Sequence, residues 1–169
     1  HLMLFYTGII RTASNVAESY VNDIENKRRQ LRIMNDLLTE SIAVLNKGKD
    51  ITAFGELLHE AWQAKRSLSA EVSNSNVDEM YNQAISAGAI GGKLTGAGGG
   101  GFMLLFVPPE KQMEVREKLN GLIYVPFKFE FSGSQIVFFS QQKDYSIWEK
   151  ERAKQSIQVF KELEYSKKM

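Results

Sequence analysis

The stretch GGKLTGAGGGGF, residues 91–102, contains seven of the 13 glycines of a chain of 169 residues. It follows a segment whose apolar residues recur at helical spacing, and it leads into an apolar run that is typical of a strand. Glycine loses more conformational freedom on folding than any other residue, so a cluster this dense indicates positive φ angles or a backbone pressed against another group. We therefore expect a loop between a helix and a strand, with glycines that serve either chain packing or ligand binding.

Two familiar nucleotide-binding loops are excluded by the context of these glycines. Residues 96–101 fit the pattern G-x-G-x-x-G, but that pattern binds a dinucleotide between a preceding strand and a following helix, and here the order is reversed. The phosphate loop of nucleoside triphosphatases needs Ser or Thr after its lysine, whereas Lys93 is followed by Leu94. Three interpretations remain: N–H groups that converge on an anion, a close approach of a chain segment or sugar phosphate, and a tight turn with nothing bound.

Composition limits the class of protein. Apolar residues make up 43% of the chain, enough for a core, and we expect one domain that spans residues 1–169. The 21 basic and 20 acidic side chains give a net charge of +1, which argues against a nucleic-acid or membrane partner. The chain has no cysteine, which is compatible with the cytoplasm, where we expect the protein to lie. The longest apolar run is too short to span a bilayer.

Apolar spacing before the glycine loop predicts one strand and four helices. A buried strand is expected at residues 2–7, and because a chain rarely begins inside such a strand, we expect further residues before His1. Asn15, Asp50 and Ser75 are expected to cap the starts of helices, and Gly48 and Gly88 are expected to end helices. The longest apolar stripe, on the second helix, consists of Leu31, Met34, Leu38, Ile42 and Leu45.

The chain changes character after the loop. Residues 102–107 read as a strand, residues 108–121 as a helix, and residues 127–131 as a strand with a hairpin partner at residues 136–139. A last helix is expected to begin near Ser146, with Glu149 completing a capping box and with Ile157, Phe160 and Leu163 on its apolar side. Strands interleaved with helices predict an α+β fold, in which helices cover a mostly antiparallel sheet.

Phe127, Phe129 and Phe131 alternate with Lys128 and Glu130. Strict alternation is what one core-facing strand requires, so we expect the three rings in the core. Aromatic side chains on a sheet also stack on RNA bases, but the acidic neighbour would repel phosphate. We therefore favour the core over an RNA-binding surface.

The glycine stretch also carries a resemblance to a known family. With the residues before it, GAIGGKLTGAGGGGF (88–102) closely resembles the third signature of the GHMP kinases, named for galactokinase, homoserine kinase, mevalonate kinase and phosphomevalonate kinase. YTGIIRTAS (6–14), HEAWQAKRSLS (59–69) and SNSNVDEMYNQAISAGA (73–89) are similar to other segments of these kinases, and FKFEFSGSQIV (127–137) closes the match. The subgroup that looks most similar is the bacterial D-glycero-D-manno-heptose 7-phosphate kinases.

This resemblance implies a C-terminal kinase domain of ferredoxin-like, split β-α-β architecture with additional helices. Family members use ATP and Mg²⁺ to phosphorylate a small molecule, here a sugar phosphate at its anomeric hydroxyl. Their catalytic aspartate, Mg²⁺ ligands and serine-rich ATP loop belong to an N-terminal domain that has no counterpart in this sequence. We therefore expect that domain as a partner, no catalytic residue in this chain, and neither tight ATP binding nor turnover by the chain alone; a homodimer stays open.

Within this half, phosphoryl transfer needs groups that neutralise charge on phosphate oxygens. The expected glycine-loop site consists of Lys93, Thr95, Gly96, Ala97, Gly98, Gly99 and Gly100, with the amides of residues 96–99 favoured and Lys93 either a ligand or a solvated lysine. A phosphate on the substrate would need a cation, and the candidates are Arg11, Lys65 and Arg66. For Arg66 we favour a role at the helix C-terminus.

Alternatives remain open at this point. A non-enzymatic ligand-binding or regulatory module would explain the lack of catalytic groups, and another GHMP kinase, acting on fucose, galactose or mevalonate, would share the glycine signature. A zinc site is not expected, since His59-Glu60 is followed by Gln63 where the motif HExxH needs its second histidine.

Overall fold

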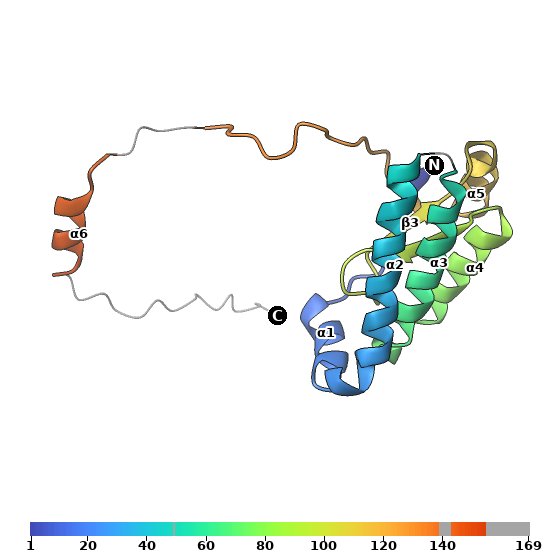
Figure 1. Cartoon of the computed structure of the whole chain (residues 1–169), viewed down its shortest axis with the longest axis horizontal. Coiled ribbons are helices and arrows are strands. Elements are labelled where there is room, and N and C mark those ends of the chain that lie inside the picture. The colour runs from blue at the N-terminus through green and yellow to red at the C-terminus, as the bar shows by residue number, and fades with distance from the viewer. Residues whose placement is uncertain (49, 139–142, 155–169) are drawn as a thin grey trace, which may run out of the picture. The chain divides into compact units, whose positions relative to one another are not determined.

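The computed structural model describes residues 1–48, 50–138 and 143–154 (Figure 1). The chain forms two compact units, His1–Lys128 and Phe129–Met169, and each is described here by itself.

The first unit is built on a four-stranded antiparallel sheet. Its strands are β1 (Leu2–Tyr6), β2 (Gly91–Leu94), β3 (Phe102–Phe106) and β4 (Ile123–Tyr124), in the spatial order β2-β3-β1-β4. Helices separate β1 from β2 and β3 from β4, so the chain follows the β-α-β-β-α-β order of a ferredoxin-like fold. The strand at the N-terminus and the strand after the glycine loop are confirmed. β2 was not expected, because its first two residues are glycines, which weaken a strand.

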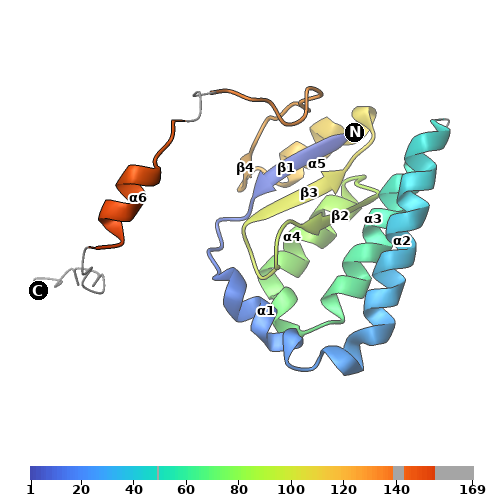
Figure 2. The same ribbon diagram turned by 60° about the vertical axis from the view of Figure 1, so that its left-hand side comes forward.

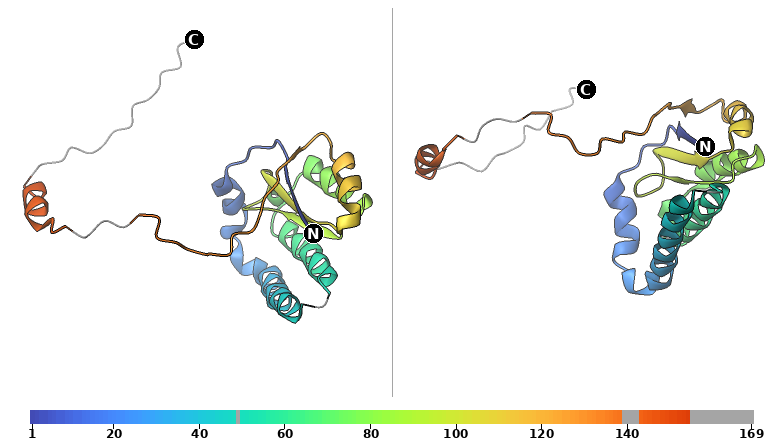
Figure 3. Two further views of the ribbon diagram at one scale, coloured as in Figure 1. Left: turned by 90° about the horizontal axis from the view of Figure 1, so that it is seen from above. Right: turned by 45° about the horizontal axis from the view of Figure 1, so that its top comes forward.

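Helices form the second layer, with α3 and α4 against one face of the sheet (Figures 2 and 3). Gly48 ends α2 in the left-handed conformation, as its position predicted. α4 begins one residue earlier than expected, because the Asn74 side chain accepts the hydrogen bond from the Val77 N–H group at 3.1 Å. The helices of this unit are α1 (Ala13–Val21), α2 (Arg28–Lys47), α3 (Thr52–Arg66), α4 (Ser75–Ser86) and α5 (Gln112–Lys118), with 3₁₀ turns η1 (Ile24–Lys27), η2 (Ala70–Val72) and η3 (Pro109–Lys111).

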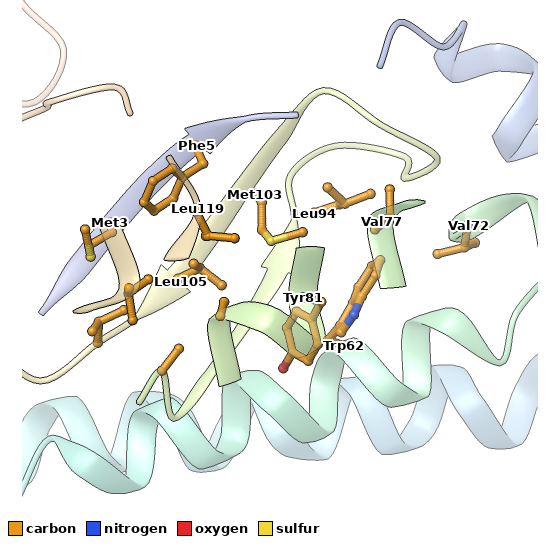
Figure 4. Packing of buried hydrophobic residues seen from close by; sticks show 14 of the residues in the cluster. Met3, Phe5, Trp62, Val72, Val77, Tyr81, Leu94, Met103, Leu105 and Leu119 are labelled. Carbon is orange, nitrogen blue, oxygen red and sulfur yellow. The ribbon is translucent and has the colours of Figure 1, made fainter. Parts of the chain in front are cut away.

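The core lies between the sheet and this helical layer (Figure 4). Alternate residues of the strands, such as Met3 and Phe5, point into it, because successive side chains of a strand face opposite sides. The helices contribute Trp62, which is 1% exposed, and Tyr81. Burial of one large apolar side chain stabilises the fold by roughly 1.5–3 kcal/mol, so this cluster holds the sheet and the helices together.

α3 lies unusually close to β2. A Cβ atom at Gly91 would stand 2.0 Å from the carbonyl oxygen of Gly55 on α3. On the neighbouring strand β3, the carbonyl oxygen of Leu104 would lie 2.6 Å from a Cβ atom at Gly92. Only glycine allows these approaches. Gly91 and Gly92, the first two glycines of the cluster, are therefore needed for the close packing of β2 on α3 and beside β3.

The apolar stripe predicted on α2 does not coincide with its packing face. Gln30, Met34, Leu37, Ser41 and Val44 are the more buried positions of the helix, whereas Leu38 is 59% exposed. α2 packs on α3, and these five positions share one side of a helix at spacings of three and four residues. The expected stripe is offset from that side, and only Met34 belongs to both.

The prediction of a core strand at Phe127, Phe129 and Phe131 is wrong. Residues 127–138 contain no strand, and these three rings are 40%, 64% and 92% exposed. The residues of β4 that pair with β1 are Ile123 and Tyr124, and the Val125 N–H group donates to the carbonyl oxygen of Leu4 at 2.8 Å. Pro126 follows, and proline is disfavoured inside a sheet. The expected hairpin partner at 136–138 is not a strand either; residue 139 lies outside the described residues.

The second unit contains α6 (Ser146–Arg152), which begins at the predicted place. The predicted capping box of Ser146 and Glu149 is not formed, because the N-cap residue is Tyr145, whose side chain makes no capping hydrogen bond. Asp144 accepts the hydrogen bond from the Ser146 N–H group at 2.9 Å. The expected continuation through Ile157, Phe160 and Leu163 lies outside the described residues. Within the described parts of the chain, no helix is both long and apolar enough to cross a bilayer.

Candidate functional site

A hollow of about 340 Å³ lies between the glycine loop and the turn that follows β1. In Figure 2 the loop that joins β2 to β3 comes down beside the segment that joins β1 to α1. The lining combines apolar side chains of the turn with the backbone of the loop. Its residues are Tyr6, Ile9, Ile10, Arg11, Ala13, Thr95, Gly96, Ala97, Gly98, Gly100, Gly101 and Phe102.

The loop backbone has a shape that requires glycine. Gly96, Gly98, Gly99 and Gly101 have φ angles of 71°, 118°, 75° and 85°, a region that L side chains rarely adopt. Steric crowding adds a second requirement. A Cβ atom at Gly98 would stand 2.6 Å from the carbonyl oxygen of Val72, and one at Gly100 would stand 2.6 Å from that of Ile9. The density of glycines thus follows from a loop pressed between η2 and the turn after β1.

Four hydrogen bonds join the loop to the turn after β1 and to η2, three of them between backbone groups. The N–H and the hydroxyl of Thr7 both donate to the carbonyl oxygen of Gly101 at 2.8 Å, and the Gly101 N–H group donates to Ile9 at 2.8 Å. On the other side, the Gly99 N–H group donates to the carbonyl oxygen of Val72 at 2.8 Å. The N–H group of Gly99, one of those expected to face a phosphate, is therefore already hydrogen-bonded within the protein.

Four other N–H groups of the loop are available. Those of Gly96, Ala97, Gly98 and Gly100 have no hydrogen-bond partner among the described residues, and all four residues line the hollow. Successive unpaired N–H groups in a loop with left-handed glycines form a concave site for an anion. Three of the four favoured amides thus remain available donors, and Gly100 joins them.

Arg11 is the cation on the lining of the hollow. Its side chain is exposed, and it makes no ion pair within the part of the chain that the structure describes. A guanidinium group presents a planar set of donors that matches two phosphate oxygens. Arg11 and the residues with unpaired amides line the same hollow, and this combination suits an anionic ligand.

Lys65 lies on α3, outside the lining of the hollow. It is 9% exposed, and its ammonium group donates to the carbonyl oxygen of Gly96. Burial, with a smaller contribution from the nearby charge of Lys93, lowers the pKa of Lys65 to about 8. Among the described residues no carboxylate pairs with it, so its contact with the loop is through the Gly96 carbonyl.

The structure places the remaining candidates differently. Arg66 forms an ion pair with Asp78 at 2.8 Å, and Asp78 also accepts a hydrogen bond from the Ser73 hydroxyl at 2.6 Å. Arg66 therefore holds α3 to the start of α4 and does not line the hollow. Thr95 lines it, with its hydroxyl donating to the Phe102 carbonyl oxygen at 3.3 Å, whereas Lys93 is a half-buried residue of β2.

One residue with a direct contact to the loop was missed. The side-chain amide of Asn74 donates to the carbonyl oxygen of Gly99 at 2.9 Å, while its side-chain oxygen caps α4. The sequence SNSN before this helix offered four neighbouring polar residues as caps, and the choice between them depends on the loop that lies beside it.

His59 belongs to the packing of α3 on α4. Its Nδ1 lies 2.7 Å from the hydroxyl of Tyr81, and the two rings stack. In the described ranges there is no group of three His, Cys, Asp or Glu side chains that could hold a metal ion.

The fold and the hollow together define an α+β domain whose glycine loop lines a hollow with residues that carry unpaired amides. The sequence profile of the family described as GHMP kinases C terminal matches residues 38–124, so the chain belongs to this family.

Named relatives agree with this assignment. The chain is 30% identical over 120 residues to D-glycero-alpha-D-manno-heptose 7-phosphate kinase of Campylobacter jejuni, a match that covers 70% of this chain and 35% of that protein. It is 32% identical over 127 residues to the bifunctional fucokinase/GDP-fucose pyrophosphorylase of Arabidopsis thaliana, covering 70% of this chain and 12% of the relative. The chain thus spans about a third or less of the length of these curated relatives.

A solved structure shares the fold. The mevalonate kinase of Methanococcus jannaschii superimposes with a TM-score of 0.62 and 25% sequence identity, over 73% of this chain and 38% of that one. The ferredoxin-like order of the sheet, predicted through the resemblance to GHMP kinases, is confirmed.

Proposed function

We propose that the chain is the C-terminal domain of an ATP-dependent sugar kinase and that its glycine loop forms one wall of the site for phosphate groups. The acceptor proposed is the anomeric hydroxyl of D-glycero-D-manno-heptose 7-phosphate. The observation that carries the proposal is the set of four unpaired N–H groups, of Gly96, Ala97, Gly98 and Gly100, that share a hollow with Arg11. The relatives named as sugar kinases supply the class of reaction.

The chemistry of phosphoryl transfer fits this set of donors. Negative charge is spread over the oxygens of the transferring phosphoryl group, and fixed N–H dipoles stabilise it without reorganisation. ATP supplies that phosphoryl group when bound, and the amides of the loop would hold its oxygens. Magnesium ions would have to be held by the phosphates and by groups outside the described residues, which offer no cluster of metal ligands.

Arg11 is assigned to the phosphate that the substrate already carries. Of the three basic candidates it lines the hollow, while Arg66 is paired with Asp78 and Lys65 with the Gly96 carbonyl. A bidentate contact to a phosphate dianion is a strong, oriented interaction. Arg11 would then fix the far end of the sugar phosphate while the loop holds the phosphoryl group.

The hollow lacks a general base. Its lining contains no carboxylate and no histidine among the described residues, and we propose that the group that takes the proton of the attacking hydroxyl comes from another domain. We propose that this domain is the N-terminal domain typical of the family and that the chain of residues 1–169 alone does not turn over substrate. The cytoplasm, where ATP and sugar phosphates are abundant, is the proposed compartment.

The test is an assay of the whole gene product that contains this chain, with ATP, Mg²⁺ and a panel of acceptors, followed by phosphorus NMR. We expect a 1-phosphate on heptose 7-phosphate and no product from residues 1–169 alone. Arg11→Met should raise KM for heptose 7-phosphate by about 10-fold or more, since a charged hydrogen bond contributes roughly 1.5–3 kcal/mol. Arg32→Met, on the exposed side of α2, is the control and should leave KM unchanged.

A second acceptor class is supported by the fucokinase relative. An unphosphorylated sugar such as fucose has no group for Arg11 to bind, so Arg11→Met would leave its KM unchanged. Turnover of fucose, galactose or mevalonate in preference to heptose 7-phosphate would replace the proposed substrate and keep the reaction. Phosphate binding without turnover of any acceptor would instead favour a regulatory binding module.

A further inference from the structure

Two side chains bond to carbonyl oxygens of the glycine loop from outside the hollow. The ammonium group of Lys65 donates to Gly96, and the side-chain amide of Asn74 donates to Gly99 at 2.9 Å. Neither side chain belongs to the lining of the hollow. Both contacts therefore act on the loop from the side that a ligand does not occupy.

A hydrogen bond that holds a carbonyl group also fixes the direction of the N–H group of the next residue, because both belong to one peptide plane. A peptide bond is planar, and in the trans form its C=O and the N–H of the following residue point in opposite directions. No cis peptide bond occurs among the described residues. A Gly96 carbonyl held toward Lys65 thus turns the Ala97 N–H away from Lys65, and a Gly99 carbonyl held toward Asn74 turns the Gly100 N–H away from Asn74.

Ala97 and Gly100 are two of the four residues with unpaired N–H groups, and both line the hollow. Resting on the anion site proposed above, we propose that Lys65 and Asn74 are positioning residues that hold the Ala97 and Gly100 amides toward the bound phosphate. Without them either peptide group can turn over, and a carbonyl oxygen would then face the anion and repel it.

The cost of each contact supports a role beyond packing. A buried ammonium group without a carboxylate partner is destabilising, and Lys93 adds to this because it has the same charge. An apolar side chain of similar length would fill the same space without that penalty. Asn74 is held on both sides, since its oxygen accepts from the Val77 N–H group while its amide donates to the loop, so its donor has a fixed direction.

Two substitutions separate the contacts. Lys65→Met removes the donor to Gly96 and keeps the length of the side chain. Asn74→Asp keeps an oxygen that caps α4 and removes the donor to Gly99. Lys47→Met, at the exposed end of α2, is a control for the loss of one lysine, and Lys65→Arg tests rescue by another cationic donor.

The first readout needs no ligand. Residual dipolar couplings of the ¹⁵N-labelled chain report the direction of each N–H bond. Lys65→Met should change the coupling of Ala97 and leave that of Gly100, Asn74→Asp should do the reverse, and Lys65→Arg should restore the wild-type value at Ala97. Unchanged couplings at Ala97 and Gly100 in both variants would overturn the proposal, whether or not the loop binds phosphate.

The second readout is the titration of each variant with inorganic triphosphate, followed through the amide resonances of the loop. Each substitution should weaken binding by about tenfold, the value of one misdirected hydrogen bond to a charged group. Redirected amides with wild-type affinity would also refute the positioning role. Failure of the wild-type chain to bind triphosphate even weakly would count against the anion site itself. Should Lys65→Met not fold, Asn74→Asp carries the same test at the second carbonyl.

Discussion

Alanine substitutions at three glycines of the loop should differ in cost because the structure gives each a different reason to be glycine. Gly96 has a φ of 71° and open space where a Cβ would stand. Gly100 has no positive φ, but a Cβ would stand 2.6 Å from the carbonyl oxygen of Ile9. Gly98 combines a φ of 118° with a contact of 2.6 Å to the carbonyl oxygen of Val72. The three positions thus separate backbone strain from steric overlap.

The magnitudes follow from these differences. A positive φ costs an alanine about 1–2 kcal/mol, and the reduced freedom of the unfolded chain returns about 0.4–1 kcal/mol, so Gly96→Ala should lower the free energy of unfolding by about 1 kcal/mol. Steric overlap costs about 1–3 kcal/mol, and the same return from the unfolded chain leaves about 1.3 kcal/mol for Gly100→Ala. Gly98→Ala has both the strain of a positive φ and the steric overlap. It also displaces the Val72 carbonyl oxygen from the Gly99 N–H group, and loss of that hydrogen bond costs about 1 kcal/mol, so the total is about 4 kcal/mol.

The assay is urea denaturation of the chain of residues 1–169, followed by the fluorescence of the buried Trp62. With a slope of about 1.5 kcal/mol per M, the midpoint should fall by roughly 0.7 M for Gly96→Ala, 0.9 M for Gly100→Ala and 2.7 M for Gly98→Ala. Equal midpoints for Gly96→Ala and Gly98→Ala would refute the reasoning, because they would mean that Val72 does not confine the loop. An unchanged midpoint for Gly100→Ala would do the same for Ile9.

Three further predictions concern polar groups around the loop. The pKa of Lys65 is about 8 in the folded chain, against an ordinary value of 10.5, so the unfolded chain binds more protons between these two pH values and the free energy of unfolding should rise from pH 8 to pH 10. In urea titrations, Lys65→Met should lose this rise. A rise of equal size in both proteins would contradict the assignment to Lys65. Asp78→Asn should lower the free energy of unfolding by about 0.5–1 kcal/mol, because it removes the half-exposed ion pair with Arg66. The difference in stability between this variant and wild type should shrink in 1 M salt, which screens the pair. A difference that does not depend on salt would indicate a packing effect instead. Tyr81→Phe should cost about 1 kcal/mol by removing the hydroxyl beside His59, and thermal unfolding that matches wild type would show that this contact is not formed in solution.

Local signals in the sequence predicted most helices and two of the strands. The position of Gly48 indicated a left-handed helix end, and the strand at residues 102–107 was evident from its apolar run. Such signals work because capping, periodicity and turn formation depend on residues a few positions apart.

Predictions failed where distant segments decide the structure. Gly91 and Gly92 looked like part of a loop but belong to β2, because they pair with Phe106 and Leu105 of β3. They are glycines because α3 and β3 approach them too closely for any side chain. Phe127 and Phe129 looked like core residues, yet β4 ends at Tyr124, and both rings are exposed. Alternation predicts a strand only where a neighbouring strand continues beside it.

The candidate site shows the same division. The sequence by itself determined that a glycine loop would lead into a strand and take positive φ angles, which other residues rarely adopt, but it placed a helix rather than β2 before that loop. It did not determine which amides are available. Only the tertiary structure decided that Gly99 donates to Val72 and that Lys65 and Asn74, 31 and 25 positions from their carbonyl partners, hold the loop. Hydrogen bonds between segments so far apart depend on how α3 and α4 pack against the sheet, which no local pattern encodes.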